Sequence, residues 1–156
     1  MKITTHNKLA SARKMQTERL ITWGKTNPQN LFLLDGIGAI LSAALLGVVL
    51  VKLEEFFGIP KQTLYFLASF PVLFALYDFY HFAQKGAANA IFLKGIAVAN
   101  IAYCLLSLGV TFYHHSTLTL FGCLYVLGEV MIVIALAMLE YSVAQKLESE
   151  KAGLNG

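Results

Sequence analysis

Four long apolar runs decide most of what this chain can fold into. Each contains between 21 and 25 residues, and together they cover 31–51, 63–83, 90–113 and 117–141. About 20 apolar residues are enough to cross the hydrocarbon core of a bilayer as a helix. Strands of a membrane barrel would be about ten residues long and would alternate in polarity, which these runs do not. The sequence therefore predicts an all-α integral membrane protein with four transmembrane helices.

The composition supports a membrane protein and excludes several other classes. Of the 156 residues, 57% are hydrophobic and only 13% are charged, whereas an ordinary soluble domain has about 25% charged residues. A chain of this length cannot hide so much apolar surface in a core of its own. We therefore exclude a soluble enzyme, a nucleic-acid-binding protein and a secreted disulfide scaffold. The lipid bilayer is the expected partner.

The connections between the runs are short, at 52–62, 84–89 and 112–116. Short connections make successive helices antiparallel neighbours. The predicted transmembrane domain at 31–141 is therefore an up-down four-helix bundle.

Basic residues are distributed unequally between the two ends of the predicted helices. Six precede the first run, namely Lys2, Lys8, Arg13, Lys14, Arg19 and Lys25. Four more belong to the same side, and two to the other: Lys85, Lys94, Lys146 and Lys151 against Lys52 and Lys61. Because cytoplasmic loops are enriched in Lys and Arg, we predict that the N- and C-termini are both cytoplasmic, with 142–156 as a tail. The expected location is a cell membrane crossed several times, most simply the bacterial inner membrane.

The basic segment 1–30 allows two interpretations. A helical wheel gathers Leu9, Ala12, Gln16, Leu20 and Trp23 on one side, with Lys14 and Glu18 opposite. Such a helix would lie on the cytoplasmic leaflet as an interfacial amphipathic helix. The alternative is a disordered basic tail that only sets the topology. Asn27-Pro28 indicates an N-cap and a first helical residue, where the first span begins.

Ionisable residues inside the runs are the candidate functional residues. A charged side chain is costly to place in a bilayer, and for this reason such residues usually face the bundle interior. They are Asp35, Asp78, His81, Lys94, Glu129 and Glu140. A rise of about 1.5 Å per residue places all but Glu129 within one to two turns of the cytoplasmic face. We expect a polar layer there, with Lys94 paired to Asp35 or Asp78. The alternative is that some of these residues, Lys94 and Glu140 above all, only anchor helix ends.

Glu129 differs from the others because it lies near the middle of its run. Asn100 and Ser42 arrive at a similar depth on their own helices. We interpret Glu129 as a proton-carrying or ligand-binding carboxyl group; the alternative is a protonated glutamate that joins helices. The candidate ligand- or proton-binding residues are Glu129, Asn100, Asp78, His81, Asp35 and Lys94.

No motif in the sequence predicts catalysis, a cofactor or a metal site. Cys104 and Cys123 lie in different runs and form no Cys-x-x-Cys pair. His81 lies near one face and His114 near the other, so two histidines do not meet at one depth to hold haem. We therefore expect a protein that is not an enzyme and has no cofactor.

Leu34-Asp35-Gly36 lies near the start of the first run, and Tyr77-Asp78-Phe79-Tyr80 lies in the second. With four runs over nearly the whole chain, the sequence resembles small four-span membrane proteins of bacteria. The resemblance implies the architecture and no particular activity.

The functional expectation is a small transporter-like or ligand-binding bundle with an intramembrane polar site. The alternative is a structural or assembly subunit that binds a membrane-protein partner or a second copy of itself. A ridge of small residues at Ala39, Ala43 and Gly47 would permit such close contacts. A third possibility, a lipid-modifying enzyme, could use only Asp78 with His81.

Overall fold

In the computed structural model the chain is helical, and the structure describes residues 2–84 and 90–154. The elements in chain order are α1 (Lys2–Thr26), α2 (Pro28–Ala44), the π-helical segment η1 (Leu45–Leu50), α3 (Glu54–Phe57), α4 (Lys61–Ala83), α5 (Ala90–Tyr113) and α6 (Leu120–Leu154). No strand occurs within these two ranges. The predicted all-α class is confirmed. The predicted connection at 84–89 lies almost entirely outside the described residues.

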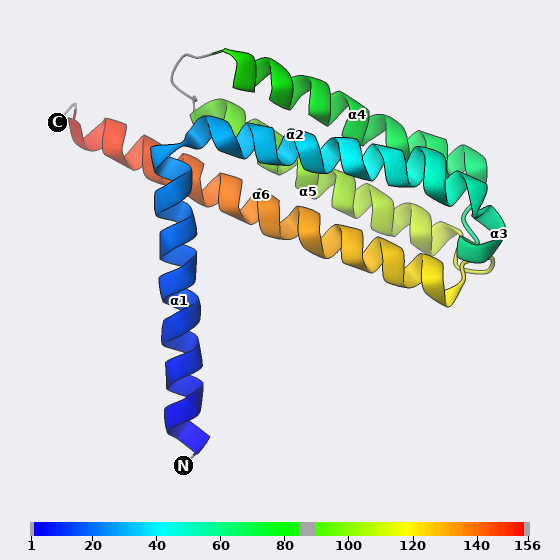
Figure 1. Cartoon of the computed structure of the whole chain (residues 1–156), viewed down its shortest axis with the longest axis horizontal. Coiled ribbons are helices and arrows are strands. Elements are labelled where there is room, and N and C mark those ends of the chain that lie inside the picture. Colours follow the sequence, from blue (N-terminus) through cyan, green and yellow to red (C-terminus); the bar gives the residue numbers. More distant parts are fainter. Residues whose placement is uncertain (1, 85–89, 155–156) are drawn as a thin grey trace.

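Four helices are long and apolar enough to cross a membrane: α2 with η1, α4, α5 and α6. They lie alongside one another, with α3 at one end of the group and the junction of α1 and α2 at the other (Figure 1). Helix α5 has the bounds predicted for the third transmembrane helix, 90–113. Large apolar side chains such as Leu76 and Ile132 are more than 60% exposed on the outer surface of the group, as expected of helices with lipid as their solvent.

The last helix is longer than predicted. We expected it to end at Tyr141, but α6 continues to Leu154. At about 1.5 Å per residue, the 34 residues from Leu120 to Gly153 measure about 50 Å, well over the thickness of a bilayer core of about 30 Å. Its final turns have partners outside the bundle, such as the 3.0 Å ion pair between Lys146 and Glu18 of α1. These contacts stabilise the polar C-terminal turns of α6.

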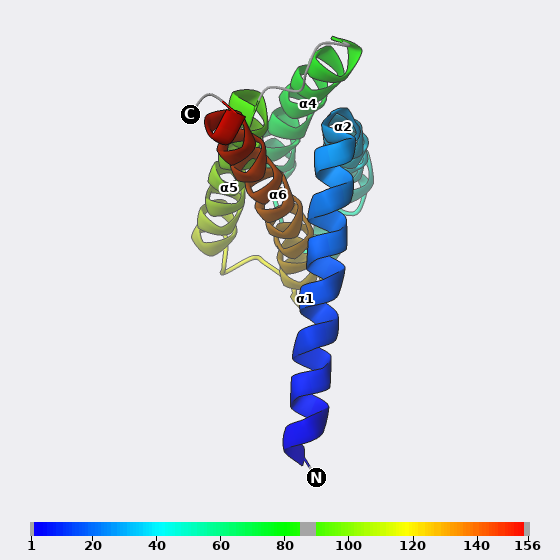
Figure 2. The same cartoon turned by 90° about the vertical axis from the view of Figure 1, so that its left-hand side faces the viewer.

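The N-terminal segment is helical, and α1 leaves the bundle crosswise to the long helices, at the end where α6 finishes (Figures 1 and 2). The direction of the chain changes at Asn27, and α2 begins with Pro28 at its first turn, as predicted, although the Asn27 side chain makes no capping hydrogen bond. Gly24 makes the contact with α6 close, since a Cβ there would lie 2.7 Å from a methyl carbon of Val143. Trp23 is 43% exposed.

Two residues of the predicted α1 stripe, Leu9 and Ala12, have side chains outside the described part of the chain. Leu20 of the same stripe is exposed, while Ile21 is buried among residues of the bundle. The C-terminal end of α1 therefore packs on the bundle through Ile21, while the apolar side chain of Leu20 beside it is exposed.

Helix α2 packs most closely on α4, and α5 packs most closely on α6. Glycine permits the first of these contacts: a Cβ at Gly36 would lie 3.2 Å from the Cβ of Asp78. In η1, a Cβ at Gly47 would lie 3.5 Å from that of Ala68. Gly47, the last residue of the small-residue ridge, thus faces α4 of the same chain.

Two apolar clusters fill the bundle, one toward α3 and one toward α1. The cluster toward α3 contains Leu46, Leu50, Val51, Ile59, Leu64, Leu67, Ala68, Tyr103, Cys104, Val126 and Val130. The cluster toward α1 contains Ile21, Leu31, Phe32, Ala90, Leu93, Ile96, Val143 and Ala144. On each of α2, α5 and α6, one buried polar side chain lies between the residues of these two clusters. These side chains belong to the candidate site.

Candidate functional site

A buried polar layer crosses the bundle between the two apolar clusters. Each long helix contributes one member: Asp35, Asp78, Asn100 and Glu140, of which none is more than 5% exposed. The Asn100 side-chain amide donates a hydrogen bond of 2.9 Å to Oδ2 of Asp35. We predicted Asn100 at the depth of Glu129, but its hydrogen bond places it beside Asp35. The apolar cluster on the α1 side separates this layer from the end of the bundle, so its carboxyl groups do not reach solvent as helix-end anchors would.

The acids of this layer lie close to one another. The carboxyl groups of Asp35 and Asp78 are within hydrogen-bonding reach, and Glu140 is near enough to interact electrostatically with both. In the described structure, no donor lies at ordinary hydrogen-bonding distance from either oxygen of Asp78 or of Glu140, although the Asn100 amide is close enough to interact with Glu140. Two carboxyl groups can share a hydrogen bond only when one of them holds a proton. A buried charge also needs a partner, so this layer requires protons or a cation.

Glu129 forms a second polar group, further along the bundle toward α3. The Ser42 hydroxyl of α2 and the Tyr103 hydroxyl of α5 both donate to its Oε1, Tyr103 at 3.2 Å. Its other oxygen, Oε2, has no partner among the described residues. The sequence led us to expect Ser42 here, but not Tyr103. Tyr103 follows Asn100 by three residues and so shares its helix face, which is the signal that could have identified it.

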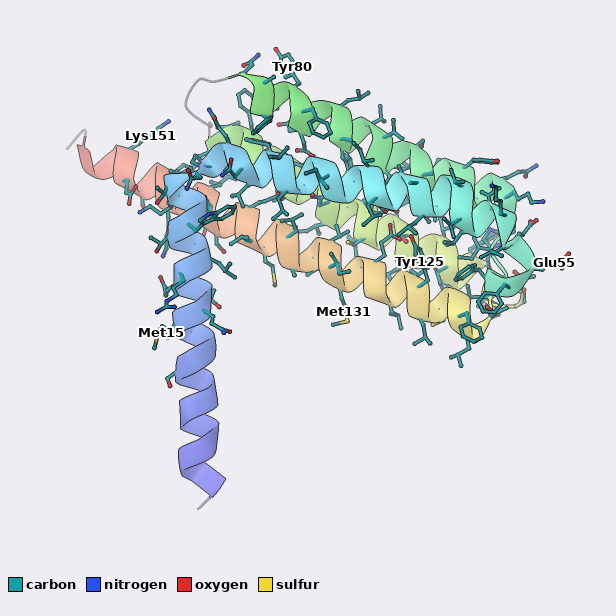
Figure 3. All side chains as sticks on the ribbon, in the orientation of Figure 1. Met15, Glu55, Tyr80, Tyr125, Met131 and Lys151 are labelled. Carbon is teal, nitrogen blue, oxygen red and sulfur yellow. The ribbon has the colours of Figure 1, made fainter. Side chains whose placement is uncertain are left out.

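A cavity of about 380 Å³ connects the two polar groups. It lies mainly between α2 and α6, and its polar lining comes from Asp35, Ser42, Asn100, Tyr103, Tyr125 and Glu129. Apolar side chains complete the walls, including Leu45, Phe74 and Leu136. Figure 3 labels Tyr125 on α6 and, further along that helix, Met131, whose side chain points away from the bundle. The volume of the cavity falls within the range of small-molecule sites, about 300–1,000 Å³.

Three of the predicted site residues line this cavity: Asp35, Asn100 and Glu129. Asp78 lies directly behind Asp35 and does not reach the cavity. Glu140, which the sequence offered chiefly as a helix-end anchor, is fully buried in the same layer.

Lys94 and His81 do not join the polar layer. Lys94 Nζ pairs with Glu148 of α6 at 2.5 Å, so the predicted pairing with Asp35 or Asp78 is wrong. The reason is the continuation of α6 past residue 141, which places an acid beside the start of α5. His81 is surrounded by aromatic rings, and the centroid of its own ring lies 4.2 Å from that of Phe92. Within the described residues no hydrogen bond joins it to Asp78.

An open apolar groove of about 550 Å³ lies between α4 and α5, away from the polar cavity. Its lining includes Thr63, whose hydroxyl lies 3.0 Å from Nε2 of His114. These two helices make far less extensive contact with each other than α2 makes with α4. The groove therefore belongs to the surface of the bundle.

No known protein family, curated protein or solved structure matches this chain. Within the described residues, no group of three or more His, Cys, Asp or Glu is arranged to hold a metal ion. Fold and site together define an all-helical protein with four potential membrane-spanning helices and, mainly between α2 and α6, a cavity whose lining includes two acids.

Proposed function

We propose that this chain is a multi-pass membrane protein that binds a small ligand inside its helix bundle, as a transporter-like or ligand-binding protein. The cavity between α2 and α6 is the observation that carries the proposal. Asp35 and Glu129 both line it and come from different helices. Carboxyl groups inside a membrane bundle are costly and are usually retained for substrate, ion or proton binding. We assign the chain no enzymatic activity.

In the membrane, the four long helices form an up-down bundle with both termini in the cytoplasm. The ten-to-two distribution of Lys and Arg supports this orientation. Because α1 runs crosswise to the bundle at that end, it lies along the cytoplasmic leaflet (Figure 2). A bacterial inner membrane is the proposed location.

Thermal unfolding of the purified full-length chain tests the ligand-binding function. The probes are a panel of small amphipathic molecules that includes cations, anions and neutral compounds. A ligand that binds only the folded state raises the unfolding temperature. We expect at least one class of probe to do so for the natural chain. The same class should have no effect on a Gly38→Leu/Gly128→Leu variant, in which leucine side chains occupy the cavity mouth.

Gly153→Leu is the matched control for these substitutions. Gly153 is exposed near the end of α6, a Cβ there meets no atom within 4 Å, and the residue lines neither the cavity nor the groove. This variant should respond to the probes as the natural chain does. If no probe stabilises the natural chain more than the filled variant, the cavity does not bind small molecules and the proposal is wrong.

A role as an assembly subunit is the second candidate, and the groove between α4 and α5 favours it. An open apolar groove between weakly packed helices could receive a helix of another membrane protein or of a second copy. Mild-detergent purification followed by mass measurement tests this role. A stoichiometric partner that is lost in the Gly109→Leu variant would support it, since Gly109 lines the groove.

A further inference from the structure

The cavity offers acceptors of hydrogen bonds and negative charge, but no basic group. No Lys, Arg or His is among its lining residues. Glu129 belongs to this lining, and its carboxyl oxygen Oε2 is buried without a partner among the described residues. Behind Asp35, the side chain of Asp78 is fully buried and both of its oxygens lack a donor. The wall of the cavity is therefore short of positive charge, which a bound ligand could supply.

The rest of the lining would suit an apolar ligand body. Phe74, Val133 and Leu136 contribute hydrocarbon surface to the cavity. Aromatic groups are also present: the Tyr103 and Tyr125 rings belong to the lining. Aromatic faces attract cations within about 6 Å. An apolar molecule with a positive charge would match both parts of the cavity.

The cavity opens at the side of the bundle, between α2 and α6. Gly38 on α2 and Gly128 on α6 both line it, both are exposed, and a Cβ on either would meet nothing within 4 Å. Leu41 and Ile132, also in the lining, are 59% and 71% exposed. In a membrane-spanning bundle this side faces lipid. A ligand dissolved in the bilayer would then enter laterally, without crossing the apolar clusters toward α1 and α3.

We infer that the cavity binds a lipophilic organic cation, which enters from the bilayer between Gly38 and Gly128 and pairs with the carboxyl groups of Glu129 and Asp35. This inference rests on the proposed ligand-binding function and names the class of ligand. On binding, the carboxylic acid of Glu129 releases its proton to solvent and the resulting carboxylate pairs with the cation. No covalent bond to the ligand forms.

Polar and titratable groups from several helices face these two acids. Glu129 faces Ser42 from α2, Tyr103 and Cys104 from α5 and Tyr125 from its own helix. Asp35 faces Asp78 from α4, Asn100 from α5 and Glu140 from α6. None of these described neighbours is a base that would compete with the ligand for the carboxylates. Because Glu129 loses its proton when it pairs with the cation, binding should be stronger at alkaline than at acidic pH.

Binding of three probes of the same shape but different charge tests the inference. The probes are tetraphenylphosphonium, tetraphenylborate and the uncharged tetraphenylsilane, added to the full-length chain in lipid nanodiscs, with empty nanodiscs to correct for partitioning. We expect tetraphenylphosphonium to bind with about thirtyfold or higher affinity than either of the others, as for an ion pair formed out of water. Its affinity should fall by a similar factor in Glu129→Gln, which keeps the shape and the acceptor for Ser42.

The outcomes separate the inference from the proposed function. Equal affinity for all three probes, abolished by Gly38→Leu/Gly128→Leu, would overturn the cationic ligand and leave the binding function intact. Probe binding that is unchanged in that double variant would overturn both. Tetraphenylphosphonium affinity that is unchanged in Glu129→Gln and in Asp35→Asn, or that does not rise with pH, would also overturn the inference. Gly153→Leu should bind like the natural chain, and circular dichroism checks that each variant is folded.

Discussion

Asn100 donates a 2.9 Å hydrogen bond to Asp35 across the bundle, and both side chains are almost fully buried. This bond joins α5 to α2, two helices that otherwise contact α6 and α4 most closely. It therefore links the two helix pairs of the bundle at the layer of buried acids.

The Asn100–Asp35 bond should contribute measurably to stability. Interhelical hydrogen bonds in membrane proteins are worth about 1 kcal/mol. We expect Asn100→Ala and Asp35→Ala to show a coupling of that size in a double-mutant cycle, measured by reversible unfolding in detergent micelles. Strictly additive effects of the two substitutions would mean that the bond contributes nothing.

Contact between α6 and α3 should not tolerate a side chain at Gly122. A Cβ there would lie 2.1 Å from the carbonyl oxygen of Phe57 and 2.8 Å from a methyl carbon of Leu118. Overpacking of this kind costs about 1 to 3 kcal/mol. Gly122→Ala should therefore lower the free energy of unfolding by this amount. Gly128→Ala on the same helix should leave it nearly unchanged, because a Cβ there meets nothing within 4 Å; equal losses in both variants would contradict this account.

Protonation of Glu54 in acid should destabilise the turn between α3 and α4. Its Oε1 accepts a 3.0 Å hydrogen bond from the backbone N–H of Lys61. This bond, followed by the interactions with the Lys61 side chain, lowers the pKa of Glu54 below its ordinary value of 4.5. A lowered pKa means that the stabilisation is present above about pH 4.5 and is lost as the pH falls through the folded-state value.

Unfolding of the natural chain and of Glu54→Gln, compared across that pH range, measures the contribution of this charge. The natural chain should be slightly the more stable at neutral pH, and the difference should vanish in acid. A difference that stays constant with pH would show that the Glu54 charge has no such role.

Trp23 should report the position of α1 at the membrane surface. It is the single tryptophan of the chain, and it is 43% exposed on a helix that runs crosswise to the bundle. Trp rings favour the headgroup region. In reconstituted vesicles, lipids brominated near the headgroup should quench its fluorescence more than lipids brominated near the chain ends. Strong quenching by aqueous iodide instead would place α1 in water.

The two ends of the bundle should be accessible from opposite sides of the membrane. Glu55 on α3 and Lys151 near the end of α6 are both exposed, at opposite ends of the bundle (Figure 3). In a chain whose two native cysteines are replaced by alanine, an impermeant maleimide should label Glu55→Cys on intact cells. It should label Lys151→Cys only after permeabilisation. Labelling of both positions on intact cells would exclude the proposed topology.

The four membrane-length helices followed from the sequence because hydropathy and length belong to each segment separately. A run of more than 20 apolar residues has to satisfy its own backbone hydrogen bonds, whatever its neighbours are. The same holds for the start of α2, where Pro28 fits the first helical turn. The polar candidates were also found, since Asp35 and Glu129 stand out within otherwise apolar runs.

The partners of these residues followed from packing in three dimensions. Counting residues along a helix estimates depth, but it contains neither the axial shift nor the rotation of one helix against the next. Helices that are apolar all round carry little periodicity that could set the rotation; here it depends on close contacts such as that of Gly36 with Asp78. For this reason Asn100 meets Asp35 and not Glu129, and Lys94 meets Glu148. The cavity depends on the same contacts, because it lies between helices and no single segment encodes it.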